Sequence, residues 1–145
     1  MTGYPHVLAP IRIRGHFIKN RIVTGPSTIH SASNGEPYPT EEAMRFFENR
    51  AKAGAGIVTV AGVSTGPAVD DGMHASWDLY QANHTNALAE LADRIHFYGA
   101  KASMELMGIF HDGYTVSDGA PQMNFEPGRE IPVKEMERFK EWYAD

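Results

Sequence analysis

Apolar residues recur along this chain every three or four positions in three segments, as one buried helix stripe requires. The first predicted helix begins at Thr40, a good N-cap residue, and ends at Gly54, a good C-cap glycine. The second ends at Gly99 and the third opens near Pro132. The stripes are Ala43, Phe47 and Ala51; Leu88, Leu91, Ala92 and Ile95; and Met136, Phe139 and Tyr143.

Runs rich in apolar and β-branched residues predict three strands. The first, 21–24, is expected to stop at the Gly25-Pro26 pair. The second, 56–63, is almost wholly apolar, which is typical of a strand covered on both faces in a parallel sheet. The third is 101–107. A hairpin is predicted before all three, from the apolar residues that flank a turn at 14–16: Ile11, Ile13, Phe17 and Ile18.

The order of these elements is a hairpin followed by β-α-β-α-β-α, which predicts an α/β fold of parallel strands joined by right-handed crossovers. The loops after the strands are long and those before them are short, so a ligand is expected at the carboxyl ends of the strands. Three strands cannot close a barrel and leave two open sheet edges. The chain is therefore either a small open α/β layer or a piece of something larger, and the final helix without a following strand favours the second.

Composition narrows the classes of function. The 145 residues fit one domain, with 42% hydrophobic residues and a net charge of -5 that argues against a nucleic-acid or anionic-membrane partner. The absence of cysteine excludes disulfides, thiolate metal sites and a Cys nucleophile within this stretch. No apolar run approaches the roughly 20 residues of a membrane span, and no secretory signal is visible. A soluble cytoplasmic protein is expected.

Few residues stand out as candidates for chemistry. The Gly54-Ala55-Gly56 run precedes a strand, which indicates a tight turn rather than a dinucleotide-binding loop. None of the seven histidines pairs at metal-ligand spacing, so no metal site is expected. His30, just past the first strand, is either a solvated loop residue or a ligand contact. Glu105 lies in the third strand, which is otherwise expected to be buried. A buried carboxylate is costly unless it is paired, so Glu105 is expected either to face outward or form an ion pair, or to point at a ligand.

Five segments in order along the chain closely resemble the Old Yellow Enzyme family of FMN-dependent oxidoreductases. They are the opening, Leu8-Ala9-Pro10-Ile11-Arg12-Ile13 followed by Ile18-Lys19-Asn20-Arg21-Ile22-Val23, and then Phe46-Phe47-Glu48-Asn49-Arg50-Ala51-Lys52-Ala53-Gly54, Gly56-Ile57-Val58, Ala92-Asp93-Arg94-Ile95-His96-Phe97-Tyr98-Gly99-Ala100-Lys101 and Arg129-Glu130-Ile131. No single segment is decisive, but five in register are specific.

The resemblance implies a TIM barrel, which normally needs roughly 250 residues. Residues 1–145 would then be the N-terminal portion of an FMN-binding barrel domain: an N-terminal hairpin followed by the first three βα units of a partial (β/α)8 barrel. The family reaction is hydride transfer from NAD(P)H to FMN, and then to an activated alkene or related small molecule. The substrate-holding pair, the usual proton-donating Tyr and the phosphate loops belong to the later part of the family's barrel, so we expect the isolated chain to be inactive and to bind FMN weakly.

The resemblance places five residues at the cofactor and one on the substrate side, and it assigns no catalytic residue: they are Pro26, Ser27, Thr28, Ala61 and Glu105 for FMN, and His30 for substrate. The Thr28 hydroxyl would lie near flavin O4 and N5, and Ala61 would let the ring approach the backbone. Glu105 stands where Gln is common. It can accept from flavin N3–H but cannot donate to O2 when ionised, which leaves the substrate class open.

Two alternatives belong to other classes. The first is a non-catalytic α/β scaffold or interaction domain that self-associates through its open sheet edges into a homo-oligomer. The second is a small phosphosugar enzyme, which the lack of a glycine-rich loop after any strand disfavours. The choice between NADH and NADPH does not follow from these residues.

Overall fold

The computed structural model describes residues 3–29, 36–65, 77–79, 81–107, 113–121 and 126–144. None of the helices in these ranges is long and apolar enough to cross a membrane. The elements in chain order are α1 (Pro5–Leu8), β1 (Ile11–Ile13), β2 (His16–Ile18), β3 (Val23–Ser27), α2 (Glu41–Lys52), β4 (Ile57–Ser64), β5 (Trp77–Asp78), α3 (Ala82–Phe97), β6 (Lys101–Met107), β7 (Tyr114–Thr115), β8 (Arg129–Glu130) and α4 (Val133–Ala144).

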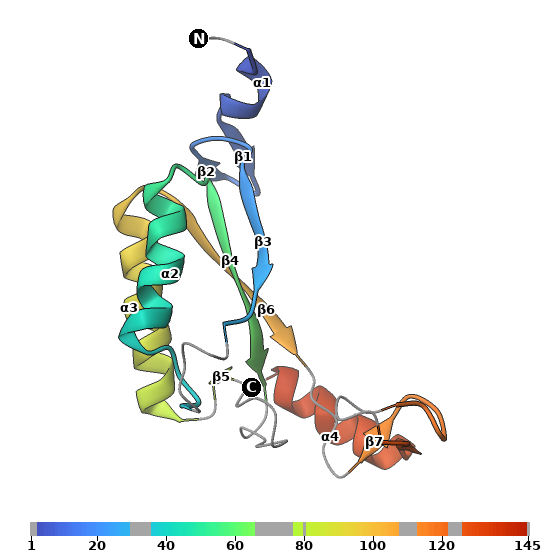
Figure 1. Cartoon of the computed structure of the whole chain (residues 1–145). Coiled ribbons are helices and arrows are strands. Elements are labelled where there is room, and N and C mark those ends of the chain that lie inside the picture. Colours follow the sequence, from blue (N-terminus) through green and yellow to red (C-terminus); the bar gives the residue numbers. More distant parts are fainter. Residues whose placement is uncertain are drawn as a thin grey trace.

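The main sheet is parallel, with β4 at its centre between β3 and β6. The short strand β5 pairs with the last two residues of β4, beyond the point where β3 ends. Helices α2 and α3 lie side by side over one face of this sheet, and the β1–β2 hairpin lies at the amino ends of the strands (Figure 1). The predicted α/β class and parallel sheet are confirmed.

The core lies between β4 and the two helices. Val58, Val60 and Val63 of β4 are buried there against the apolar stripes of α2 and α3. Phe47 of α2 and Trp77 of β5 meet edge to face, with ring centroids 6.0 Å apart. The predicted stripes of both helices are confirmed at Phe47 and Leu91, which are almost fully buried. Because α2 and α3 cover one face of the sheet, its opposite face is available for contacts outside this core.

The N-terminal hairpin is confirmed, and its turn has a clear backbone cause. Arg14 and Gly15 both have positive φ, 46° and 85°, between the paired residues Ile13 and His16. A two-residue turn with both φ values positive matches the right-handed twist of the strands that it joins.

The segment after the hairpin is tied to the turns that lead into the central strands. Lys19 Nζ donates to the carbonyl of Tyr98 at 2.7 Å, just before β6. Asn20 Nδ2 donates to the carbonyl of Gly54 at 2.7 Å, just before β4. Lys19 and Asn20, from the opening part of the resemblance, therefore tie this segment to the amino end of the sheet.

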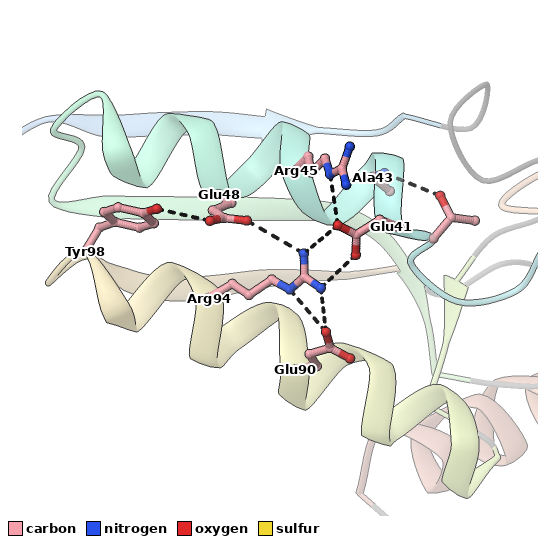
Figure 2. A network of polar contacts seen from close by, with 8 residues as sticks. Glu41, Ala43, Arg45, Glu48, Glu90, Arg94 and Tyr98 are labelled. Carbon is pink, nitrogen blue, oxygen red and sulfur yellow. Dashed lines mark hydrogen bonds and ion pairs between the residues drawn. The ribbon is translucent and has the colours of Figure 1, made fainter.

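A cluster of charged residues joins the outer sides of α2 and α3 (Figure 2). Arg94 of α3 forms ion pairs with Glu41 of α2 at 2.7 Å and with Glu90 at 2.6 Å. The hydrogen bond from Arg94 is the main reason that the pKa of Glu41 lies below its ordinary value, and a second comes from Arg45. The phenol of Tyr98 donates to Glu48 at 3.1 Å, and this bond raises the pKa of Tyr98. The two helices are thereby held in register.

Three sequence expectations are corrected. The first strand does not stop at Gly25-Pro26, because β3 continues to Ser27, and proline is tolerated there since β3 lies at the edge of the sheet among the described residues. The third strand, β6, is largely exposed rather than buried, since it pairs on one side only within that part of the chain. Of the apolar stripe in α4, Phe139 is buried while Met136 and Tyr143 are exposed.

Candidate functional site

Two irregularities in strand pairing lie near the carboxyl ends of the parallel strands. Between β3 and β4 the register passes from Thr24–Val58 to Ser27–Val60, so two residues of β3 lie opposite one of β4. The Thr24 hydroxyl accepts the Thr59 N–H at 3.2 Å where the ladder is interrupted. Bulges of this kind re-aim side chains and are common beside active sites.

The second bulge lies between β4 and β6. The register passes from Val60–Met104 to Val63–Leu106, which leaves Ala61 and Gly62 of β4 opposite a single residue of β6. That residue is Glu105. The small pair on the central strand therefore lies beside the one carboxylate of β6.

Alternation along the strands shows which side chains share a face. Val60 points into the core under the helices, and its ladder partners Ser27 and Met104 lie on the same face. The next residue in each strand, Thr28 or Glu105, therefore points to the other face. Both of these side chains are exposed. The helix-free face thus presents a hydroxyl and a carboxylate around the small residues of β4.

Gly62 belongs to this site, although the sequence analysis did not select it. Its φ is +75°, and a Cβ built on it would lie 2.9 Å from Thr28 Cγ2. Only glycine adopts this backbone without strain and lets Thr28 approach so closely. An isolated glycine within an apolar strand indicates a bulge or a close approach, and that signal could have identified it.

The structure gathers three of the six predicted site residues and separates two others. Thr28, Ala61 and Glu105 lie on the helix-free face at the carboxyl end of the sheet. Pro26 lies in the bulge of β3, and the Ser27 hydroxyl donates to the carbonyl of Gly25 at 3.2 Å on the helix side. His30, the substrate-side prediction, lies outside the described residues.

The donor set of this site suits the polar edge of a flat heterocycle. The Thr28 hydroxyl can donate or accept, and an ionised Glu105 only accepts. Ala61 and Gly62 together carry a single methyl group, so a ring can come close to the backbone of β4. These features match what the pyrimidine edge of a flavin requires, with the exception of a donor toward its O2.

A second polar cluster is buried nearby and was not predicted. His84 Nδ1 of α3 lies 2.6 Å from Asp78 Oδ1 of β5, and their side chains are 3% and 1% exposed. The Tyr38 ring lies 5.3 Å from the His84 ring between centroids. The pair joins α3 to the end of the sheet through Asp78, whose backbone pairs with Ser64. No local spacing in the sequence indicates such a contact.

Comparison with known proteins shows which family this chain resembles in sequence. The model of the NADH:flavin oxidoreductase / NADH oxidase family matches residues 6–137. The NADH oxidase of Thermoanaerobacter brockii is 26% identical over 133 residues, which are 92% of this chain and 20% of that protein. The NADPH dehydrogenase of Halalkalibacterium halodurans is 29% identical over 96 residues, which are 65% of this chain and 28% of that protein.

The fold comparison agrees with the sequence comparison. The old yellow enzyme homologue from Zymomonas mobilis superposes with a TM-score of 0.75 at 18% identity, covering 96% of this chain and 43% of that one. The chain spans between 20% and 28% of the length of the two curated relatives.

Proposed function

Because the chain belongs to the NADH:flavin oxidoreductase / NADH oxidase family, we propose that it supplies part of an FMN site in an oxidoreductase of the old yellow enzyme type. The predicted resemblance is confirmed, and with it the family's cofactor and reductant, FMN and NAD(P)H. In this proposal the three parallel strands are an arc of the family's (β/α)8 barrel, and the N-terminal hairpin closes its amino end.

One observation carries the proposal: Thr28, the Ala61-Gly62 bulge and Glu105 meet on the helix-free face at the carboxyl ends of neighbouring parallel strands. Parallel α/β folds bind their ligands at this end of the sheet. Bound there, FMN supplies hydride transfer between NAD(P)H and an acceptor such as an activated alkene. Thr28 orients the ring through its hydroxyl, and Glu105 accepts a ring N–H.

Glu105 also sets the charge of the site. An ionised carboxylate beside the ring opposes the negative charge that the flavin gains on reduction, so it lowers the reduction potential. Glu105→Gln removes that charge and adds an N–H donor. In flavin-loaded protein we expect the potential to rise on the order of tens of millivolts, since about 1.4 kcal/mol corresponds to roughly 30 mV for two electrons.

The control is Glu42→Gln, which removes the same charge from an exposed position on α2, on the helix side of the sheet. A potentiometric dye titration should show a higher flavin reduction potential for Glu105→Gln than for the unchanged protein. The control variant should have an unchanged potential. An unchanged or lower potential in Glu105→Gln would contradict the proposed role of that carboxylate.

A separate titration tests flavin binding by the 145-residue chain. The described part of the chain offers contacts to the ring edge and no glycine-rich cradle for a phosphate at this site. We therefore expect weak binding, with similar affinity for FMN and riboflavin, measured by quenching of flavin fluorescence. Stoichiometric binding of FMN at micromolar protein, with riboflavin far weaker, would overturn this expectation.

A further inference from the structure

The basic and acidic residues of this chain are distributed unevenly along its sequence. All 18 acidic residues follow residue 35, and the first of them is Glu36. Four of the 13 basic residues precede it: Arg12, Arg14, Lys19 and Arg21. The net charge of -5 therefore conceals a cationic N-terminal segment, which lies at the amino end of the sheet (Figure 1).

The β1–β2 hairpin turns one side toward the sheet and the other side away from it. Ile11 pairs with Ile18, and Arg12 pairs with Phe17. Because side chains alternate along a strand, these two pairs lie on opposite sides of the hairpin. Ile18 is buried, and its Cγ2 lies 3.1 Å from a Cβ built on Gly56, just before β4. The isoleucine side therefore faces the sheet, and the side with Arg12 and Phe17 faces outward whether or not further strands close a barrel.

The outward side combines an aromatic ring with arginines that have no counter-ion. Phe17 is 54% exposed, and Arg12 and Arg14, in the neighbouring strand and turn, are exposed as well. Arg21, which follows the hairpin, is also exposed. In the part of the chain that the structure describes, no carboxylate lies within ion-pair distance of these three arginines, whereas Arg94 is paired with three glutamates.

We propose that Arg12, Arg14, Phe17 and Arg21, named the hairpin surface here, bind an acidic segment of another protein. The N–H groups of a guanidinium form a planar fork that matches the two oxygens of a carboxylate. Arginine and aromatic residues are enriched in protein interfaces, where Lys, Glu and Asp are depleted. The partner segment carries carboxylates for the arginines and an apolar side chain for Phe17.

The residue types on the hairpin surface favour a protein over other anionic partners. An anionic lipid surface attracts Lys as well as Arg. Lys19, the one lysine among the first 35 residues, donates to the carbonyl of Tyr98 at 2.7 Å, so arginines supply the outward charge. The net charge of -5 opposes a long polyanion such as a nucleic acid. Bidentate recognition of carboxylates therefore explains the surface better than attraction to any anion.

A titration of the flavin-free chain with synthetic peptides tests the hairpin surface, independently of the proposed FMN site. The probe is a short peptide of alternating Glu and Leu, and two control peptides replace Glu by Lys or Leu by Ser. In NMR spectra of the ¹⁵N-labelled chain, the Glu-Leu peptide should shift the amides of Arg12, Arg14, Phe17 and Arg21. The Glu-Ser peptide should bind more weakly. No shifts on the hairpin at millimolar Glu-Leu peptide, or equal shifts with the Lys-Leu peptide, would overturn the proposal.

A substitution in the hairpin turn removes one charge without disturbing the fold. Arg14 has a φ of 46°, which glycine adopts freely, so Arg14→Gly keeps the turn. It should weaken binding of the Glu-Leu peptide about twofold to fivefold, the range of an exposed ion pair. The control is Lys134→Gln, which removes the same charge from an exposed position at the start of α4 and should leave the affinity unchanged. Equal affinities of the two variants would contradict the proposal.

Replacing both Arg12 and Arg14 by Lys distinguishes a protein partner from a lipid surface. The double variant keeps the charge and loses the planar donor fork, so its affinity for the Glu-Leu peptide should fall about threefold or more. Vesicles of phosphatidylserine and phosphatidylcholine should not sediment with the unchanged chain. Vesicle binding that the lysine variant retains, together with an unchanged affinity for the peptide, would show a lipid-binding surface and overturn the proposal.

Discussion

Gly62 allows the closest backbone approach in the candidate site, and Gly62→Ala should therefore be costly. The new residue must keep a φ near +75°, which costs an L-residue about 1–2 kcal/mol. Its Cβ would also lie 2.9 Å from Thr28 Cγ2, so Thr28 or the bulge must move. Together we expect a loss of about 2–3 kcal/mol in the free energy of unfolding.

Gly119→Ala separates the two contributions. Gly119 has a similar φ of +74°, but a Cβ there meets no atom within 4 Å. It should lose only the backbone cost, about 1–2 kcal/mol. Adding Thr28→Ser to Gly62→Ala removes the offending methyl group and should recover about 1 kcal/mol.

Urea unfolding, followed by circular dichroism, measures the free energy of unfolding of the unchanged chain and of the three variants: Gly62→Ala, Gly119→Ala and Gly62→Ala with Thr28→Ser. Equal losses in Gly62→Ala and Gly119→Ala, with no recovery from Thr28→Ser, would refute the close packing of Thr28 on Gly62.

Three further predictions concern the scaffold around the site. Asn20→Ala removes two hydrogen bonds at the amino end of the sheet and should lower the free energy of unfolding by about 1–3 kcal/mol, and an unchanged urea midpoint would speak against that tie. His84→Ala removes the imidazole that lies 2.6 Å from the buried carboxyl group of Asp78 and should lower the free energy of unfolding by about 1–3 kcal/mol, whereas an unchanged free energy of unfolding would count against this hydrogen bond. The lowered pKa of Glu41 means that its bond to Arg94 stabilises the fold above the ordinary pKa of a glutamate and is lost as the pH falls through the folded-state pKa. Acidification from about pH 5 to about pH 3 should therefore destabilise Glu41→Gln less than the unchanged chain, and equal losses would count against this ion pair.

Much of the fold follows from local patterns in the sequence. Thr40 as N-cap, the stripe through Phe47 and the apolar run of β4 each depend on residues close in sequence, and the structure agrees with all three. The Thr40 hydroxyl accepts the Ala43 N–H at 3.3 Å, as a capping residue should. Local signals of this kind are enough to predict a helix or strand when propensity, capping and burial all favour it.

The features that the sequence analysis missed depend on contacts between distant segments. The pair of Asp78 and His84 is made by tertiary packing of β5 on α3, and no periodicity marks it. Gly25-Pro26 continues a strand because β3 lies at the edge of the sheet in the part of the chain that the structure describes, which only the sheet order reveals. Glu105 was left between two interpretations because its orientation depends on the bulge at Ala61 in the neighbouring strand.

In the proposed site a flavin ring lies against the carboxyl ends of β3, β4 and β6. An NMR titration of the ¹⁵N-labelled chain with riboflavin tests it most directly, because weak binding in fast exchange shifts the amides nearest the ring. The largest shifts should fall on Thr28, Ala61, Gly62 and Glu105. Shifts that cluster on α2 and α3, or no shifts at millimolar riboflavin, would contradict it.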